Sequence, residues 1–185
     1  MNLIYQWMPG AYSNLSCLKF SKKFDLNVEN IIWYDDFKSV WEKIDNENLA
    51  VLPFENSYAW PIHDNLYSFL RYDYKIIAEI DLEVNHLLLS KAKNLSDIKK
   101  VYSHPQALNQ CHYFLKNNNI EAISFPDTAW AAEMISRTDD LSAWAIASSL
   151  AWEIYNLSVL ADSIQDQDWN TTKFFVIAPS DYQFD

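Results

Sequence analysis

The feature that most constrains the fold of this chain is the regular alternation of short apolar segments with segments of helical periodicity. Apolar segments such as 31–34 and 49–52 are each followed by a turn and then by apolar residues spaced three and four apart. This pattern is typical of strands alternating with helices and predicts an α/β fold. Polar residues gather where the strands are expected to end, which is where α/β proteins bind ligands.

The segment 101–115 shows this pattern most clearly, because it begins as a strand, turns, and continues as a helix. Ser103 and Gln106 have the spacing of a capping box, and Pro105 is tolerated in a first helical turn, where its missing N–H would have no partner. Gln110 lies four residues after Gln106 and shares its helix face. The segment is either an anion site at a helix N-terminus or a well-capped surface helix, and the spacing alone favours the second.

Composition limits the partners of the chain. Its 185 residues are enough for one ordinary domain or two small lobes, and 14 basic against 25 acidic residues give a net charge of −11. This acidity argues against binding to nucleic acid or to an anionic membrane, and an anion site must rely on local donors. Cys17 and Cys111 are too few for a disulfide framework and are not spaced as zinc ligands. With no signal-like N-terminus and no apolar segment of ~18 residues, a cytoplasmic protein is expected.

The later part of the chain indicates two lobes. The segment 76–89 is strand-like over its whole length and long enough to pass from one lobe to the other, and strands near the C-terminus can return. Two such crossings predict a ligand cleft between the lobes. Asp127 is expected to cap the helix that follows it, and Ser13 lies near the start of a helix over 12–24, where a cap is a better expectation than a ligand contact.

Taken together, the polar segments resemble the signature segments of the prephenate dehydratase family. Two examples are Pro-Phe-Glu-Asn-Ser at 53–57 and Ser-His-Pro-Gln at 103–106. In chain order the matching segments are 8–13, 53–57, 86–89, 103–111, 145–148 and 170–174. One such segment would be weak evidence, but six in order make the chain similar to this family from about residue 3 to residue 179.

The resemblance implies an enzyme that converts prephenate to phenylpyruvate, with loss of carbon dioxide and water, in phenylalanine synthesis. It implies a two-lobed α/β fold similar to type 2 periplasmic binding proteins, a homodimer, and no metal or organic cofactor. One catalytic domain over 1–179 is then expected, with lobe 1 at about 1–77 plus 161–179, lobe 2 at about 78–160, and a tail over 180–185. The regulatory domain that usually follows in the family is absent from these 185 residues, so feedback by phenylalanine through it is not expected.

The resemblance also assigns roles to individual residues. Thr172 corresponds to the proton donor for the departing ring hydroxyl, and because its own acidity is negligible, its catalysis must come from orientation and an electrostatic pocket. The neutral donors around the hydroxyl and carboxylates are expected to be Asn56, Ser103 and Gln110. The expected substrate-binding residues are Ser13, Ser57, Lys173 and Asp127.

The chain departs from the family pattern at four positions. Lys173 replaces an arginine, which keeps the charge but loses the bidentate fork. Asn156 replaces a glycine whose left-handed conformation asparagine tolerates. Trp7 and Trp60 stand at glycine positions, in a chain with a single glycine and eight tryptophans. Two explanations are open: the indoles reshape or silence the site, or some codons translated as Trp are read as Gly in the source organism.

Two alternatives to a prephenate dehydratase also stay open. Arogenate differs from prephenate only by an amino group in place of a keto group, which the motifs do not resolve. The other alternative is a non-catalytic protein of the same fold that binds a small anion.

Overall fold

The computed structural model describes residues 1–92, 94 and 98–183, with the side chain of Trp60 left out. The last two residues of the predicted tail lie outside the described residues. The chain divides into two compact units, which we call unit 1 and unit 2. Unit 1 comprises Met1–Met8, Tyr12–Glu83 and Thr171–Asp185, and unit 2 comprises Pro9–Ala11 and Val84–Asn170.

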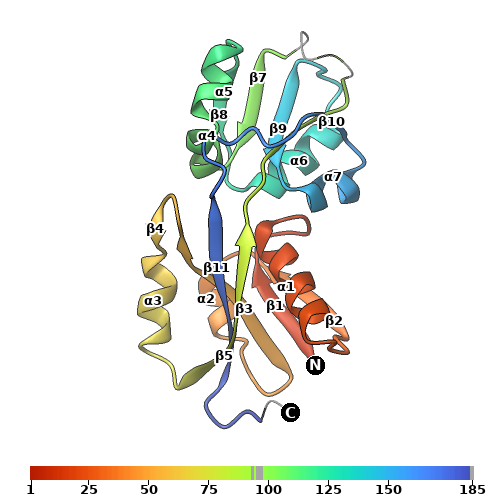
Figure 1. The fold of residues 1–185 in the computed structure, drawn as a ribbon. Helices are drawn as coiled ribbons and strands as arrows, with labels where there is room; N and C mark the ends of the chain where they lie inside the picture. Colours follow the sequence, from red (N-terminus) through yellow and green to blue (C-terminus); the bar gives the residue numbers. More distant parts are fainter. Residues whose placement is uncertain (93, 95–97, 184–185) are drawn as a thin grey trace. The chain divides into compact units, whose positions relative to one another are not determined.

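Unit 1 is a mixed sheet with helices on both of its faces (Figure 1). The strands follow the order β2-β1-β3-β11-β5, with β4 paired to β3. β1 is parallel to β2 and β3, and β11 is antiparallel to both of its neighbours. The strands are β1 (Asn2–Gln6), β2 (Asn30–Tyr34), β3 (Asn48–Asn56), β4 (Trp60–Pro61), β5 (Tyr74–Glu83) and β11 (Thr171–Pro179); the helices are α1 (Tyr12–Lys23), α2 (Phe37–Trp41) and α3 (His63–Phe69).

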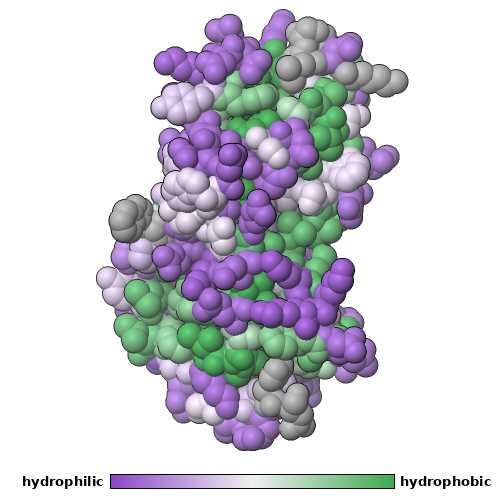
Figure 2. Space-filling model, in the orientation of Figure 1, coloured by the Kyte–Doolittle hydropathy of each residue, from purple (hydrophilic) through white to green (hydrophobic). Residues whose placement is uncertain are grey.

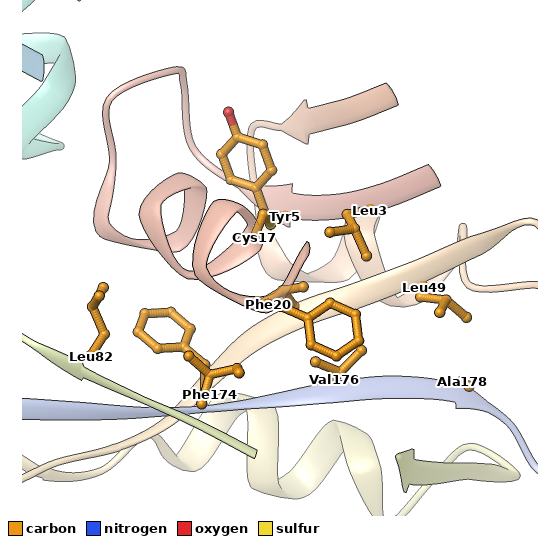
Figure 3. Close-up of a cluster of buried hydrophobic side chains, with 11 residues drawn as sticks. Leu3, Tyr5, Cys17, Phe20, Leu49, Leu82, Phe174, Val176 and Ala178 are labelled. Carbon is orange, nitrogen blue, oxygen red and sulfur yellow. The ribbon is translucent and has the colours of Figure 1, made fainter. Parts of the chain in front are cut away.

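Alternation along the strands divides the unit 1 core into two layers. Phe174 and Val176 of β11 pack with Phe20 of α1, as Figure 3 shows. The intervening residue Phe175 packs instead in the cluster that contains Trp41 of α2. Successive side chains of a strand point to opposite faces, so this sheet is buried on both sides and needs apolar residues at nearly every position.

Exposed apolar side chains on unit 1 gather at α3 and at the start of β5. Figure 2 shows hydrophobic atoms on the surface over these two elements. The side chains concerned are Leu66, Tyr67, Leu70 and Ile76, and Leu70 is 74% exposed.

Unit 2 is built around a second mixed sheet, of strand order β10-β6-β9-β7-β8. β7 is parallel to β8 and β9, while β6 is antiparallel to β9 and β10. The buried thiol of Cys111, at the junction of α4 and α5, packs in the same cluster as Trp144 and Ile146 of β9. The elements are β6 (Leu87–Ser90), β7 (Lys100–Ser103), β8 (Glu121–Ser124), β9 (Ala143–Ala147), β10 (Ser158–Ala161), α4 (Pro105–Gln110), α5 (His112–Asn117), α6 (Thr128–Arg137) and α7 (Ser149–Tyr155).

The turn Pro9–Ala11 belongs to unit 2 although its neighbours in the chain belong to unit 1. Ser148 Oγ donates to the carbonyl of Gly10 at 2.6 Å, and Tyr155 Oη donates to the carbonyl of Pro9 at 2.7 Å. Gly10 has φ +95°, and a Cβ on it would lie 3.0 Å from the Cα of Ala151. The only glycine of the chain therefore stands where both the conformation and the close approach of α7 require one.

Two predicted elements are wrong in extent. The segment 76–89 is not one strand, because β5 ends at Glu83 and β6 begins at Leu87 in the other sheet. Between them, the N–H of Val84 donates to the carbonyl of Asn170, and the N–H of His86 donates to a side chain. The helix expected through residue 115 is likewise interrupted at Cys111, which ends α4 and precedes α5.

Two local predictions are confirmed. Asp127 is the N-cap of α6 and accepts a hydrogen bond from the N–H of Trp130 at 2.8 Å. Asn156 ends α7 in the left-handed conformation, with φ 51° and ψ 47°. No helix in the part of the chain that the structure describes is long and apolar enough to cross a membrane.

We predict that Gly10→Ala destabilises the protein by about 2 kcal/mol or more, since the new Cβ meets backbone and the positive φ disfavours any L-residue. Urea unfolding measures this difference. Asn156→Gly, at a second position of positive φ, is the control and is expected to change the free energy of unfolding by no more than about 1 kcal/mol. Equal stability of Gly10→Ala and the parent would contradict the prediction.

Candidate active site

Asn56 and Thr172 form a hydrogen-bonded pair at the end of the β3–β11 ladder in unit 1. They stand opposite each other in the antiparallel register, and both are buried. Asn56 Nδ2 donates to Thr172 Oγ1 at 2.9 Å. A threonine hydroxyl has one hydrogen and two lone pairs, so an oxygen that accepts from Asn56 keeps its own hydrogen to give to another acceptor.

The turn that follows β3 fixes the orientation of the Asn56 carboxamide. Its Oδ1 accepts from the backbone N–H groups of Tyr58 at 3.1 Å and Ala59 at 3.0 Å. With the oxygen held by two donors, the amino end is the one that faces Thr172. Ser57 joins the turn to β11, because its Oγ accepts from the N–H of Thr171 at 2.9 Å.

Lys173 does not join this pair. Adjacent residues on a strand point to opposite faces, so Lys173 is directed away from the face that holds Thr172. Its Nζ lies 2.9 Å from Glu79 Oε1, and Glu55 and Asp81 flank it in the register. The hydrogen bond to Glu79 raises the pKa of Lys173. Contact of Lys173 with a substrate stays a prediction.

Ser13 is buried in the first turn of α1 in unit 1. Its carbonyl accepts a hydrogen bond from Ser16 Oγ at 2.8 Å. Its predicted role toward a substrate carboxylate is not tested by this placement.

In unit 2, Gln110 is held by a buried histidine. His86 Nε2 lies 2.8 Å from Gln110 Oε1, and both side chains are buried. Burial lowers the pKa of His86 to about 4, while the hydrogen bond with Gln110 acts in the opposite direction. The ring is therefore neutral at pH 7.

Ser103 has a different partner from the one its spacing predicts. It is the last residue of β7, and its Oγ donates to the carbonyl of Ile146 in β9 at 2.6 Å. The predicted capping box is wrong, because the helix begins one residue later: His104 is the N-cap, and its Nδ1 accepts from the N–H of Gln106 at 3.2 Å. The single hydroxyl hydrogen of Ser103 is thus used within the sheet.

Asp127 is a buried carboxylate, only 2% exposed. Its Oδ1 caps α6, whereas Oδ2 is enclosed with no hydrogen-bond partner among the described residues. Burial raises the pKa of Asp127 from 3.8 to about 6, against the lowering effect of backbone N–H donors at the start of α6. At pH 7 the fold therefore holds an incompletely compensated charge at this position.

Among residues 1–92, 94 and 98–183, no three His, Cys, Asp or Glu side chains come together as a metal site. Both cysteines are buried, and burial raises the pKa of each thiol.

The backbone at Trp7 has φ +75°, a conformation that glycine adopts readily and that is strained for tryptophan. The indole packs against the ring of Phe37, with centroids 6.4 Å apart. Trp60 pairs with Asn56 through its backbone in β4, and its side chain lies outside what the structure describes. Both explanations for these residues stay open: ordinary Trp codons at positions 7 and 60 would exclude recoding.

Sequence reasoning missed two groups at these sites. His86 lies at the start of an apolar segment, and its contact with Gln110, 24 residues away, gives no local signal. The backbone donors of Tyr58 and Ala59 could have been found, because an asparagine at the end of a strand commonly accepts from N–H groups two and three residues later.

The two units thus define a class of protein: mixed α/β domains in which carboxamide and hydroxyl groups are buried and held by hydrogen bonds. The prephenate dehydratase family model matches residues 3–182, and the chain belongs to this family. This confirms the resemblance carried by the six sequence segments.

Named relatives agree with this assignment. The chain is 39% identical over 181 residues to arogenate dehydratase/prephenate dehydratase 1 of Arabidopsis thaliana, covering 96% of this chain and 45% of that protein. It is 34% identical over 178 residues to the prephenate dehydratase of Methanocaldococcus jannaschii, and this match covers 95% of this chain and 64% of that protein. The chain therefore spans about half the length of the plant relative and less than two thirds of the other.

Solved structures agree on the fold. The prephenate dehydratase of Staphylococcus aureus is 26% identical with a TM-score of 0.83, covering 100% of this chain and 68% of that one. GqqA, described as a novel type of quorum quenching acylase, is 26% identical with a TM-score of 0.85, covering 100% and 66%. A periplasmic transporter, 9% identical with a TM-score of 0.52 over 98% and 77%, shares the fold alone. The predicted α/β class and its likeness to periplasmic binding proteins are confirmed.

We predict that Asp127→Asn stabilises the protein more at pH 7.5 than at pH 4. A folded pKa above the unfolded value favours folding at low pH, and this contribution is lost as pH rises through the folded value near 6. Asparagine keeps the cap without the charge. The free energy of unfolding of Asp127→Asn, relative to that of the parent, should therefore rise by about 2–3 kcal/mol from pH 4 to pH 7.5.

The matched control for this measurement is Asp36→Asn, at the N-cap of α2. The pKa of Asp36 is lowered, mainly by its hydrogen bond from the N–H of Ser39. The free energy of unfolding of Asp36→Asn should therefore fall relative to that of the parent as pH rises. Urea unfolding at both pH values measures the two variants. If the stability of both variants relative to the parent changes with pH in the same direction, the prediction is wrong.

We predict that Trp7→Gly is more stable than Trp7→Ala by about 1 kcal/mol, because both remove the indole and only alanine retains a Cβ at positive φ. Trp33 in β2 is the control, since it has no positive φ. At that position Trp33→Ala should be more stable than Trp33→Gly by roughly 0.5–1 kcal/mol. Thermal unfolding of the four variants tests the reversal, and the same order at both positions would contradict it.

Proposed function

We propose that this chain carries the activity of its family, the decarboxylating dehydration of prephenate to phenylpyruvate. The observation that carries the proposal is the pair in unit 1, in which Asn56 donates to Thr172 Oγ1 and leaves the threonine hydrogen available to an acceptor. Family membership and the names of the relatives support the same reaction.

The chemistry of the reaction asks for a proton donor and needs no base. As the ring becomes aromatic, the bond to the ring carboxylate breaks to give carbon dioxide, and its electron pair expels the ring hydroxyl. Thr172 gives its hydrogen to the departing oxygen, which leaves as water, and the threonine regains a proton from solvent. Negative charge builds on Thr172 Oγ1 during the transfer, and the Asn56 amide, already aimed at this atom, stabilises it without reorganisation.

In unit 2, Gln110 is the proposed donor to a substrate carboxylate. Its carboxamide is buried and carries an amino group that can donate a hydrogen bond, which supplies local attraction in a chain of net charge −11. Ser103 uses its hydrogen on Ile146, so in this arrangement it fixes β7 to β9 and can only accept from a ligand. A direct donor role for Ser103 stays a prediction, as do the substrate contacts of Ser13, Ser57, Lys173 and Asp127.

Arogenate is the alternative substrate, because the Arabidopsis relative is named for both activities. Turnover of prephenate and arogenate by the same preparation decides between them. A cytoplasmic homodimer and the division into lobe 1 and lobe 2 also belong to the proposal. Sedimentation of the purified chain measures the subunit number.

We predict that Thr172→Ala lowers kcat for phenylpyruvate formation by about 10²–10⁴-fold, the usual contribution of a positioned acid. Thr172→Ser keeps the hydroxyl, so its kcat should fall much less. Asn56→Ala should lower kcat by roughly 10²-fold, the usual effect of removing one donor to a developing charge.

Thr171→Ala is the matched control, because Thr171 is the preceding residue of β11 and its side chain points to the opposite face. It should retain the kcat of the parent. If the folded protein turns over neither prephenate nor arogenate above the spontaneous rate, the activity proposal fails and the non-catalytic, anion-binding alternative is favoured. Equal losses in Thr171→Ala and Thr172→Ala would refute the assigned donor.

A further inference from the structure

Lys173 is a charged residue of β11 that the reaction described above does not use. Its Nζ lies 2.9 Å from Oε1 of Glu79 in the neighbouring strand β5. In the strand register Lys173 stands opposite Asp81 of β5 on one side and Glu55 of β3 on the other. Residues directly opposite each other in an antiparallel pair share a face of the sheet, so carboxylates from both neighbouring strands lie around one ammonium group.

The charges of this group do not balance. The group, which we call the Lys173 cluster, consists of Lys173, Glu55, Glu79 and Asp81 and so contains three carboxylates and one ammonium. The hydrogen bond to Glu79 raises the pKa of Lys173, and the charges of the three carboxylates act in the same direction. Within the described part of the chain, no other cation forms an ion pair with these carboxylates, and Lys19 Nζ donates to the backbone carbonyl of Asp81. Without the ammonium of Lys173, like charges would face one another across β11.

The strand pairing next to the Lys173 cluster is irregular. The β3–β11 register shifts between Lys173 and Phe174, so the last two pairs of the ladder, those of Thr172 and Lys173, are separated from the others by a bulge. Phe174 stands opposite Pro53, which has no N–H to donate to the ladder. The end of β3 that carries Asn56 is therefore the place where repulsion between carboxylates would most easily move the strands apart.

Hydrogen bonds of the turn after β3 also reach this end of β11. The N–H of Ser57 donates to the carbonyl of Thr171 at 2.9 Å, and Ser57 Oγ accepts from the N–H of Thr171 at 2.9 Å. These bonds join the strand ends, but their groups are uncharged and do not offset repulsion between the carboxylates of β3 and β5. The ammonium of Lys173 does offset it.

We propose that Lys173 is a positioning residue, which offsets the three carboxylates of its cluster from the strand between them and so keeps Thr172 in register with Asn56. This role differs from the substrate contact that the family resemblance implies for Lys173. Its effect on turnover rests on the proposed function, whereas its effect on strand pairing is a property of the free protein.

The first test measures strand pairing and needs no activity. Lys173→Met removes the charge at similar length, and amide hydrogen exchange followed by NMR reports how often each part of the strand opens. We expect the amides of residues 171–173 to exchange at least about tenfold faster, while those of residues 175–177, on the other side of the bulge, keep the rates of the parent. Unchanged exchange at residues 171–173 would overturn the inference, whatever the protein catalyses.

Lys100→Met is the matched control for this variant. Lys100 is also a strand residue in an ion pair, with its Nζ 2.8 Å from Asp140 Oδ2 in unit 2, and the side chains of Lys100 and Lys173 are 31% and 35% exposed. Its ion-pair partner is a single carboxylate, so its removal leaves no strand between like charges. Lys100→Met should therefore change neither the exchange at residues 171–173 nor kcat.

The second test is kinetic and follows the turnover of prephenate. A displaced proton donor lowers kcat rather than substrate binding, so we expect Lys173→Met to lower kcat by about 10- to 100-fold and to change KM by less than about threefold. Lys173→Arg keeps the charge and should restore kcat to within about threefold of the parent. If Lys173 instead contacts a substrate carboxylate, KM rises while kcat is kept, and the inference is wrong.

The third test neutralises the carboxylates of the Lys173 cluster. In a background of Glu55→Gln, Glu79→Gln and Asp81→Asn, Lys173→Met should lower kcat by less than about threefold, because no like charges remain to separate the strands. An equally large loss in both backgrounds would show that the lysine acts through something other than these charges, and the inference would be wrong.

Circular dichroism establishes whether each variant is folded. If Lys173→Met is unfolded but folds in the neutralised background, the repulsion acts on the fold as well and the inference holds; if it folds in neither background, the inference is wrong. If the parent turns over neither prephenate nor arogenate, the proposed function fails, and hydrogen exchange alone decides the role of Lys173.

Discussion

The antiparallel pairing of β11 with β3 is the contact on which the proposed chemistry depends. It places Thr172 opposite Asn56, 116 residues earlier in the chain. The same ladder continues through the apolar core of unit 1, where Phe174 and Val176 are fully or almost fully buried. A hydroxyl of ordinary acidity can act as a proton donor only when it is held in place, and here the strand that holds it is one of the most deeply packed elements of the unit.

Both units use a carboxamide with its oxygen already occupied. In unit 1 the oxygen of Asn56 is held by two backbone N–H groups, and in unit 2 the oxygen of Gln110 is held by His86. The amino end of Asn56 then donates to Thr172 Oγ1. A chain of net charge −11 repels an anion at long range, so fixed neutral donors supply local attraction without a buried cation.

Backbone conformation sets a second constraint. Gly10 satisfies it, since positive φ and the approach of α7 leave no room for a Cβ. Asn156 also has a positive φ, at the end of α7, and asparagine tolerates this conformation. Trp7 has φ +75°, which is unfavourable for a tryptophan. The scarcity of glycine in this chain therefore has a structural counterpart at a specific position. Either the strain at Trp7 belongs to a diverged protein, or the residue at this position is glycine in the organism.

Much of the fold could be predicted from the sequence, because the evidence for it is local. The alternation of apolar and amphipathic segments predicted the α/β class, and a short polar side chain before a helical segment predicted the cap at Asp127. The left-handed end at Asn156 was expected from the family resemblance, in which glycine stands at this position. Extents were less predictable: a strand continues only while it has a partner, and β5 and β6 belong to different sheets.

By itself, the sequence determined the class of fold, the family and the types of residue at the candidate site, since these depend on periodicity and on motifs read along the chain. Only the tertiary structure decided which way those residues act. In the structure Lys173 lies on the face opposite Thr172, the hydroxyl of Ser103 donates within the sheet, the amide of Asn56 donates to Thr172, and the carboxamide oxygen of Gln110 contacts His86. Each of these contacts joins residues distant in the chain through a hydrogen bond or a strand register, although the turn that orients the Asn56 amide is itself local.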